Sequence, residues 1–377
     1  MAGKDRTGES GVSDVGIVID SRRWGGGDRV MVVAELGVNH DGSVARAIEL
    51  TEAAAVAGAD AIKLQVFCAD RLMNASAEFA AYQVGVTGST PSTCSGQAGL
   101  PQANSPREML RRYELGDDDL RKIVGHARDL GLAVIATPFS PEDVARLVKL
   151  DLSAVKIASP DLVNWPLLRA AAAMGKPLLV STGAATIDEL RRSVAWLAQW
   201  HAMVALLHCV SAYPVGDEWA HVSWIRELAT FGWAVGYSDH ATDELAGALA
   251  VAAGAAVIEK HLTLDREAPG PDHAASADVA GFGRYVKLIR RAEKLMGHGA
   301  KRVLEIERDV RRVSRQSVVA RRGIRAGAAI VEADVTVQRP GTGIGAAEFE
   351  GVIGRAVQRD IAAGTILTEA MFTAGAR

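Results

Sequence analysis

The stretch GYSDHATDELAGALAVAAGAAVIEKHLTLD, residues 236–265, contains one full repeat of the pattern that decides the fold. An apolar run ends in SDH (238–240), an Ala-rich segment with helical spacing follows, and a second apolar run ends in EKH (259–261). This order is typical of a strand, a helix and a second, parallel strand. A histidine at the end of both strands has no evident use in packing a parallel sheet, so the pattern indicates a site there.

The same alternation recurs over about 250 residues, the usual length of a TIM barrel. Each apolar run is followed by a segment with helical spacing, such as VARAIELTEAAAVAG after the first run. Eight such units indicate an α/β fold of the TIM (β/α)8 type rather than an open sheet. No G-x-G-x-x-G follows the first run, which argues against a dinucleotide-binding fold. The eight runs are VMVVAE, DAIKLQ, LAVIATP, AVKIAS, PLLVST, VALLHC, WAVGYS and AAVIEK.

The regions outside the repeats suggest the domain organisation. We expect an N-terminal tail and hairpin at 1–27, with two short β-runs around the Gly-rich turn, and the barrel at 28–297. A charged linker at 298–312 leads to a small β-rich domain at 313–377, in which RAGAAI and AAGTIL read as turns. The connection at 84–106 is long and poor in apolar residues, so we expect it to be functional or mobile.

Glycines mark the predicted helix ends. Gly58, Gly131, Gly175 and Gly254 each follow a helical segment, where a left-handed residue commonly closes the last turn.

Composition narrows the function classes. Of 377 residues, 49% are hydrophobic and 23% charged, and the net charge of −3 offers no surface for nucleic acid or anionic membrane. Cys68, Cys94 and Cys209 have no pair-like spacing, which is typical of a reducing compartment. No apolar run reaches the roughly 18 residues of a membrane span. The polar start MAGKDRTGESGVSDVG lacks a signal core, so we expect a cytoplasmic protein.

Polar residues at the strand ends are the candidates for chemistry, because TIM-barrel active sites lie at the carboxyl ends of the strands. In chain order these positions are Glu35, Asn39, His40, Lys63, Gln65, Thr137, Ser140, Lys156, Ser159, Ser181, Thr182, His208, Ser211, Tyr213, Ser238, Asp239, His240, Glu259 and His261.

His240 and His261 lie on adjacent strands at the same height, so their imidazoles can converge on one ion. Two neutral imidazoles with oxygen ligands suit Mn²⁺, Co²⁺ or Zn²⁺. The alternative is that each histidine only hydrogen-bonds a neighbouring strand end. Glu35 ends a buried strand and is a candidate for catalysis, with a structural hydrogen bond as the alternative.

Lys63 and Lys156 lie inside apolar strands and should point into the barrel mouth, because burying an unpaired ammonium group is costly. The alternative is an internal ion pair with Glu35 or Glu259. Together with the hydroxyls of Thr137, Ser159, Ser181 and Ser238, the lysines form a candidate cradle for phosphate and carboxylate. A Schiff-base lysine is a further alternative, which keeps a lysine-dependent aldolase open.

Ten motifs carry a family resemblance. In order they are AELGVNHDGS, KLQVF, ATPFS, VKIAS, LVSTGAAT, LLHCVSAYP, GYSDH, IEKHLT, PGPDHAAS and VQRPGTGI. From residue 28 to residue 372 the chain resembles the sialic acid synthases, and its C-terminal part resembles their antifreeze-like (SAF) domain. Enzymes of that family condense phosphoenolpyruvate with an N-acyl-hexosamine to give a nine-carbon 2-keto acid.

The resemblance implies a metal centre. His240 and His261 match the two protein ligands of a divalent metal, usually Mn²⁺, with Mg²⁺ or Co²⁺ as alternatives, whose other positions take water and the sugar aldehyde. Glu35 matches an essential acid near the metal. Asp272, in PGPD, matches the acid that positions the sugar and the metal-bound water.

The substrate sites and a second subunit are implied in the same way. Tyr213 and Glu259 match positions that contact the sugar, and we count Glu259 with the catalytic acids. Arg339, in QRPGTG, matches an arginine that the antifreeze-like domain of one subunit places in the barrel of the other, which implies a domain-swapped homodimer. The groups matched to phosphoenolpyruvate binding are Lys63, Thr137, Lys156, Ser159, Ser181 and Ser238.

Departures from the family pattern leave the acceptor sugar open. SPD (159–161) replaces the usual Ser-Gly-Glu/Asp, Ser211 stands where Asn is frequent, and the 84–106 connection is longer than usual. N-acetylmannosamine, a 2,4-diacetamido-trideoxyhexose (for legionaminic or pseudaminic acid) or another modified hexose would each fit. Competing functions are a pyruvate aldolase and a catalytically inactive barrel that serves as a carbohydrate-binding or assembly subunit.

Overall fold

The computed structural model describes residues 15–74, 76–78, 105–200 and 203–373. The predicted connection at 84–106 lies outside the described residues except for its last two positions. Contacts divide the chain into two compact units, Met1–His298 and Gly299–Arg377. Each unit is described by itself.

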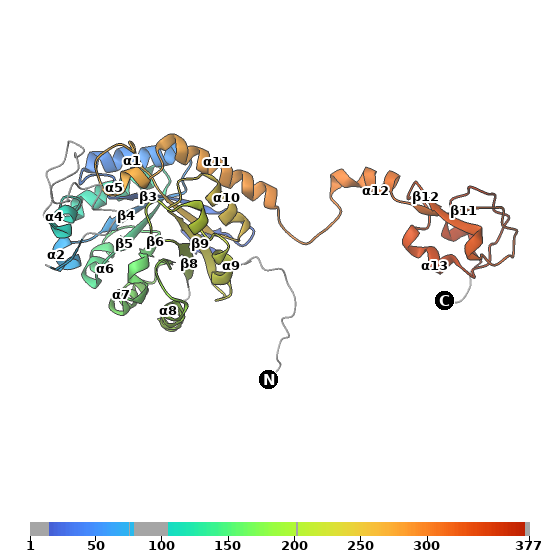
Figure 1. The fold of residues 1–377 in the computed structure, drawn as a ribbon, viewed down its shortest axis with the longest axis horizontal. Helices are drawn as coiled ribbons and strands as arrows, with labels where there is room; N and C mark the ends of the chain where they lie inside the picture. Colours follow the sequence, from blue (N-terminus) through green and yellow to red (C-terminus); the bar gives the residue numbers. More distant parts are fainter. Residues whose placement is uncertain (1–14, 75, 79–104, 201–202, 374–377) are drawn as a thin grey trace. The chain divides into compact units, whose positions relative to one another are not determined.

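The first unit is a closed barrel of eight parallel strands in the order β10-β3-β4-β5-β6-β7-β8-β9 (Figure 1). Each predicted apolar run contributes one strand, so the predicted TIM barrel is confirmed. The barrel strands are β3 (Met31–Gly37), β4 (Ala61–Val66), β5 (Ala133–Pro138), β6 (Ala154–Ile157), β7 (Leu178–Ser181), β8 (Val204–Cys209), β9 (Ala234–Asp239) and β10 (Val257–His261).

Helices surround the barrel (Figure 1). The predicted glycine ends are confirmed, since Gly58, Gly131, Gly175 and Gly254 all have positive φ. Within the described residues, the helices of this unit are α1 (Val44–Ala57), α2 (Ala69–Leu72), α4 (Pro106–Arg111), α5 (Asp117–Asp129), α6 (Pro141–Leu147), α7 (Trp165–Ala173), α8 (Ile187–Trp200), α9 (Trp224–Ala229), α10 (Leu245–Ala252) and α11 (Val279–Met296).

Helix α5 illustrates why these segments are helical and how they pack. Its first turn carries three aspartates, which the positive end of the helix dipole favours. Its buried residues follow the spacing of one helix face. They are Leu120, Ile123, Val124 and Ala127.

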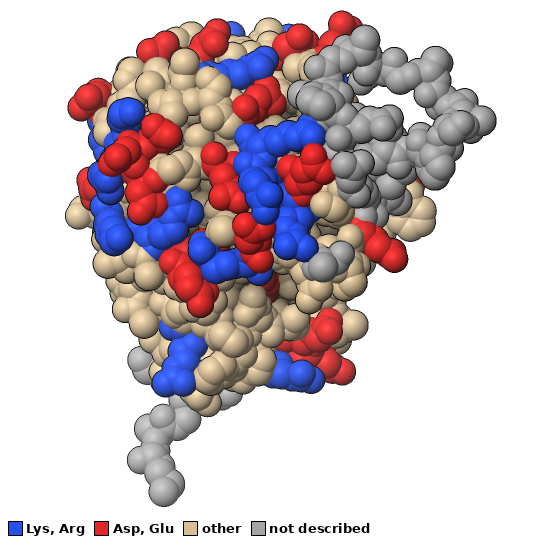
Figure 2. All heavy atoms as spheres, turned by 90° about the vertical axis from the view of Figure 1, so that its left-hand side faces the viewer, with Lys and Arg blue, Asp and Glu red and all other residues tan. Residues whose placement is uncertain are grey.

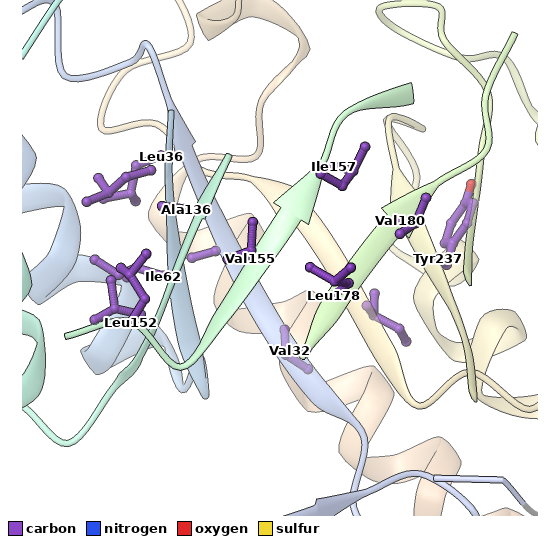
Figure 3. Packing of buried hydrophobic residues seen from close by; sticks show 14 of the residues in the cluster. Val32, Leu36, Ile62, Ala136, Leu152, Val155, Ile157, Leu178, Val180 and Tyr237 are labelled. Carbon is purple, nitrogen blue, oxygen red and sulfur yellow. The ribbon is translucent and has the colours of Figure 1, made fainter. Parts of the chain in front are cut away.

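Alternation along the strands produces two cores. Outward residues such as Val32, Ile62 and Val155 pack against the helices (Figure 3). Inward residues such as Met31 and Ala133 form a second cluster inside the barrel. Because side chains alternate between the two faces of a strand, inward positions are two residues apart. The inner apolar cluster holds inward residues toward the amino ends of the strands, and most inward residues toward the carboxyl ends are polar.

A hairpin closes the amino end of the barrel. Strands β1 (Ile17–Ile19) and β2 (Arg22–Trp24) pair antiparallel, and Ile17, Ile19 and Trp24 join the inner cluster. The hairpin was predicted, but its predicted Gly-rich turn is wrong. The turn consists of Asp20 and Ser21, whose positive φ values of 49° and 60° match the twist of paired strands, and the glycines follow β2 instead.

The second unit is small and β-rich, as predicted. Strands β11 (Ser317–Ala320) and β12 (Val335–Gln338) pair antiparallel. Gly327 and Gly364, both at φ 80°, make the two predicted turns. Helix α12 (Arg308–Ser314) precedes these strands and α13 (Phe349–Val352) follows them. The unit has its own core, which includes Val318, Ile330, Val335, Val357 and Leu367.

The surface of the first unit mixes both signs of charge. Figure 2 shows acidic and basic side chains interspersed over one face. Ion pairs such as Arg146 Nε to Asp117 Oδ1, at 2.7 Å, join neighbouring elements. None of the helices within the described ranges is both long and apolar enough to cross a membrane.

Candidate active site

The carboxyl mouth of the barrel brings together most of the predicted site residues. They occupy inward positions toward the carboxyl ends of their strands, above the inner apolar cluster. All are buried, although each is polar. The strand residues of this set are Glu35, Lys63, Thr137, Lys156, Ser181, Ser238 and Glu259.

The two lysines point into the mouth, as predicted, and also form the alternative internal ion pairs with Glu35 and Glu259. Lys63 Nζ lies 2.7 Å from Glu35 Oε2 and 2.8 Å from Glu259 Oε1. Lys156 Nζ lies 3.5 Å from the same Glu259 oxygen. Ser238 donates its hydroxyl to Glu259 Oε1 at 2.9 Å. Glu259 is therefore the centre of the network.

Burial and mutual charge shift the pKa values of this network. Burial lowers the pKa of Lys63 to about 7, an effect that Glu259 opposes and Lys156 reinforces. Burial also disfavours the charged form of Glu259, but Lys156 and Lys63 together hold its pKa well below the usual range. Glu259 thus stays ionised beside the lysines.

Several hydroxyls are left available to a ligand. Thr137 Oγ1 and Ser181 Oγ are buried and have no hydrogen-bond partner among the described residues. Gly183 donates its backbone N–H to Ser159 Oγ at 3.1 Å. A Cβ atom on Gly183 would lie 2.9 Å from Ser159 Oγ and still closer to Ser211 Oγ, so only glycine leaves this space open. Unpaired buried donors of this kind suit an anionic ligand.

The two predicted metal ligands lie side by side. The ring centroids of His240 and His261 are 5.6 Å apart. His240 Nδ1 lies 2.8 Å from the Val210 carbonyl oxygen, which leaves Nε2 for another partner. His261 Nδ1 is buried without a hydrogen-bond partner among the described residues. The Tyr213 ring covers the pair, with its centroid 4.1 Å from that of His240.

The electrostatics differ between the two imidazoles. Burial disfavours the charged form of His240, but Cys209 and the Val210 carbonyl oxygen raise its pKa above the usual value. Burial, His240 and Lys63 lower the pKa of His261 well below its usual value, which keeps this ring neutral. Burial raises the pKa of Asp272 to about 6. Cys209 Sγ lies 3.8 Å from His240 Nδ1; although burial opposes ionisation of the thiol, His240 lowers its pKa to about 7.

Gly37 locates the acids relative to the imidazoles. A Cβ atom on Gly37 would lie 3.2 Å from both Asp272 Oδ2 and Glu35 Oε1, and 3.4 Å from His261 Cε1. The two carboxylates and one imidazole therefore surround one small space. Among the described residues, no group of three or more His, Cys, Asp and Glu side chains has metal-binding geometry. The two histidines could hold a divalent ion whose other positions stay open.

Contacts between distant loops hold the segment that carries Asp272. Asn39 donates to the Leu262 carbonyl oxygen at 2.9 Å and to Ser276 Oγ at 2.8 Å. Ser276 Oγ in turn donates to the Asp272 carbonyl oxygen at 2.7 Å. His273 Nε2 lies 3.2 Å from Asp41 Oδ1. These contacts join the loop after β3 to the loop after β10.

Some candidate positions lie elsewhere. His208 faces outward, with Nε2 2.8 Å from the Ala220 carbonyl oxygen and its ring stacked on Tyr237. Ser140 caps α6. Arg339 is an exposed residue of the second unit. Conversely, Cys209 is a mouth residue that was not predicted; it lies two residues after the inward Leu207 and therefore at an inward position.

Asp239 and Lys260 also face outward, because each lies one position from an inward residue. Lys260 Nζ is 2.9 Å from Asp239 Oδ2, on the side of the barrel that faces the helices. The SDH and EKH motifs therefore divide between the two sides of the barrel wall.

Comparison with known proteins agrees with this architecture. The NeuB family matches residues 50–301, and the SAF domain matches residues 315–373. An N,N'-diacetyllegionaminic acid synthase of Legionella pneumophila is 36% identical over 342 residues, covering 89% of this chain and 92% of that protein. A pseudaminic acid synthase of Campylobacter jejuni is 32% identical over 350 residues, covering 91% and 97%.

A solved structure gives the same result. The N-acetylneuraminic acid (sialic acid) synthetase of Leptospira borgpetersenii, in complex with citrate, superposes with a TM-score of 0.68 at 28% identity. The match covers 78% of this chain and 94% of that one. The chain is therefore an enzyme that belongs to the NeuB family of synthases and carries a C-terminal SAF domain.

Proposed function

We propose that this enzyme condenses phosphoenolpyruvate with an N-acylated hexosamine and water, giving a nine-carbon 2-keto sugar acid and phosphate. The observation that carries the proposal is the arrangement of the barrel mouth. Lys63 and Lys156 lie there with buried hydroxyls that have no hydrogen-bond partner among the described residues. The imidazoles of His240 and His261 lie at the same end of the barrel. Such a mouth offers a site for an anionic substrate and a site for a metal-bound aldehyde at the same end of the barrel. The legionaminic, pseudaminic and sialic acid synthases among its relatives support this reaction class.

Phosphoenolpyruvate would bind to the lysines and hydroxyls. Charge-assisted hydrogen bonds from Lys63 and Lys156 would hold its phosphate and carboxylate, aided by the hydroxyls of Thr137, Ser159, Ser181 and Ser238. In the substrate-free site Glu259 forms ion pairs with the ammonium groups of both Lys63 and Lys156. These contacts hold both ammonium groups pointed into the mouth before the anion arrives.

The remaining polar groups would serve the sugar. C3 of phosphoenolpyruvate attacks the aldehyde carbon of the open-chain sugar, water adds at C2, and phosphate leaves by C–O cleavage. Glu35 and Asp272 are the carboxylates placed to move protons in these steps. Tyr213 and Glu259 would contact the sugar.

His240 and His261 would hold a divalent metal ion, Mn²⁺ first, with Mg²⁺ and Co²⁺ as alternatives. When bound, such an ion acts as a Lewis acid on the sugar aldehyde. His261 Nδ1 supports this assignment, because it is buried, has no hydrogen-bond partner among the described residues and lies 3.9 Å from Asp272 Oδ2.

Phosphate release from phosphoenolpyruvate tests the reaction. The purified full chain, with Mn²⁺, should release phosphate only when an acceptor is added, and mass spectrometry should find the nine-carbon product. The acceptor panel should contain N-acetylmannosamine and 2,4-diacetamido-trideoxyhexoses, because the relatives divide between these sugar types. Pyruvate trapped on Lys63 or Lys156 by borohydride would favour the aldolase. Phosphate release without an acceptor would contradict the proposal. The absence of turnover with every acceptor of a broad panel would contradict it as well.

We also propose a domain-swapped homodimer in which Arg339 serves the barrel of the partner subunit. Arg339 is exposed and has no ion pair within the described residues, which leaves its guanidinium for another surface. We expect the enzyme to act in the cytoplasm, where phosphoenolpyruvate is made.

A further inference from the structure

A buried polar cluster lies behind the two histidines, on the helix side of the barrel wall. Asp239, Lys260 and Tyr285, hereafter the outer triad, come from β9, β10 and α11. Lys260 Nζ lies 2.9 Å from Asp239 Oδ2, and the Tyr285 hydroxyl donates to the same oxygen at 2.7 Å. Lys260 Nζ also lies 4.7 Å from the centre of the Tyr285 ring, in cation–π contact. All three side chains are buried.

Stability alone does not account for the outer triad. Val235 and Ile258 on the same face of the wall, and Phe282 on α11, belong to the apolar core. A buried ion pair is expensive to desolvate, and apolar residues of similar size often stabilise a protein equally well. A charged pair in this layer therefore points to another role.

The outer triad holds the backbone of Ala241, the residue directly after His240. Asp239 Oδ1 accepts the Ala241 backbone N–H at 2.8 Å, and Lys260 donates to the Ala241 carbonyl oxygen at 2.6 Å. The turn that carries His240 is thus fixed by the side chain before it and by a lysine from the next strand. That lysine directly precedes His261, and it is the register partner of Asp239.

Helix α10 makes room for this arrangement. A Cβ atom on Gly247 would lie 2.6 Å from Tyr285 Cζ and 2.7 Å from its hydroxyl oxygen. Glycine disfavours helix relative to alanine, and α10 is otherwise rich in alanine and leucine. The need for the Tyr285 hydroxyl to reach Asp239 explains the glycine.

We propose that the outer triad consists of positioning residues that set the spacing and orientation of His240 and His261. This inference rests on the proposed metal site. Residues that orient metal ligands commonly change metal affinity by about 10–100-fold when they are replaced. The outer triad does so through the backbone, because it contacts neither ring.

Metal binding by the full chain tests the proposal without relying on activity. The Mn²⁺ dissociation constant is measured by electron paramagnetic resonance of free Mn²⁺, and the visible spectrum is recorded with saturating Co²⁺. We expect Lys260→Met to weaken Mn²⁺ binding about 10–100-fold and to alter the Co²⁺ spectrum. Tyr285→Phe, which keeps the ring and its cation–π contact, should have a smaller effect in the same direction.

Arg290→Met is the matched control. Arg290 also lies on α11, but it pairs with Asp60, which precedes β4 at the amino end of the barrel. Its loss should lower thermal stability and leave Mn²⁺ affinity and the Co²⁺ spectrum unchanged.

The outcomes separate this proposal from the metal site itself. Wild-type affinity and spectrum in folded Lys260→Met and Tyr285→Phe would overturn the positioning role alone. If Lys260→Met does not fold, Tyr285→Phe and Gly247→Ala decide by the same measurements. Equal Mn²⁺ binding by wild type and His240→Ala would overturn the metal site and the positioning role together.

Discussion

Lys63 bridges two glutamates, and this sets the expected result of its replacement. Lys63→Met would leave Glu35 and Glu259 buried without their nearest cation, which should cost about 3–5 kcal/mol of unfolding free energy. Lys156→Met should cost less, because Glu259 keeps its 2.8 Å contact with Lys63. Both variants should weaken phosphoenolpyruvate binding. Urea unfolding and calorimetric titration with phosphoenolpyruvate measure the two effects.

The double variant Lys63→Met/Glu259→Gln separates stability from binding. It should recover part of the lost stability, since one uncompensated charge is gone, but not the affinity for phosphoenolpyruvate. Recovery of both would show that Lys63 has only a structural role.

The histidine pair makes a sharper prediction. His240→Ala and His261→Ala should each abolish metal-dependent turnover, because a site with two imidazoles cannot keep its ion with one. Metal content after dialysis and turnover with added Mn²⁺ are the measurements, with far-UV circular dichroism as the control for folding. Near-normal metal content and turnover in either variant would contradict the metal assignment.

Replacement of Gly183 tests the proposed phosphoenolpyruvate site, because it reduces the space beside Ser159 without removing a charged side chain. Gly183→Ala adds one methyl group within 2.9 Å of Ser159 Oγ, and its φ does not require glycine. We expect phosphoenolpyruvate affinity to fall by about tenfold or more, roughly 1.4 kcal/mol, and urea unfolding separates this effect from any loss of stability. Gly125→Ala is a suitable control, because a Cβ atom there meets nothing within 4 Å. Unchanged affinity would place the phosphoenolpyruvate site elsewhere in the mouth.

At the scale of the strands, apolar runs predict the barrel but do not say which side of the wall each polar residue faces. The strand-end positions included Asp239 and His208 beside Ser238, although only Ser238 faces inward. The period of two along a strand contains the missing information. If Glu35 faces inward, then residues an even number of positions away on the same strand face inward too. For each strand, the orientation of one residue must therefore be known, and that residue serves as its anchor. A single sequence gives no anchor for most strands.

The hairpin shows a different limit. Three consecutive glycines are a strong turn signal, yet Asp20 and Ser21 adopt the left-handed conformation that closes the hairpin. The packing of Ile17, Ile19 and Trp24 inside the barrel decides the register, and no local pattern reveals it.

Trp24 should therefore matter for stability and not for catalysis. Its side chain is 4% exposed and fills the amino end of the barrel. Trp24→Ala should cost about 3–5 kcal/mol in urea unfolding, as expected for a large buried side chain. Because the site lies at the opposite end, the folded variant should keep the wild-type KM for phosphoenolpyruvate. A large increase in that KM would mean that the hairpin influences the mouth.

At the scale of the molecule, the site depends on contacts between the two ends of the barrel sequence. Asn39 and Ser276 are 237 positions apart and hold the segment of Asp272. Spacing and composition do not predict such a contact. Asp272 was predicted as a site residue only from the family resemblance. The lysines and hydroxyls of the mouth could be predicted from the sequence. Each of these residues lies near the carboxyl end of a barrel strand, and the carboxyl ends of all eight strands lie together.

Complementation tests the proposed exchange of SAF domains between subunits. Arg339→Ala and Glu35→Gln should each inactivate the homodimer. If Arg339 serves the partner's barrel, a heterodimer of the two variants contains one site with both residues intact, so mixing should restore activity. The expected maximum is one working site per heterodimer. The control is a mixture after verified subunit exchange in which both subunits carry Glu35→Gln, which should stay inactive. Verified heterodimers of Arg339→Ala with Glu35→Gln that remain inactive would mean that Arg339 acts in its own barrel or in none.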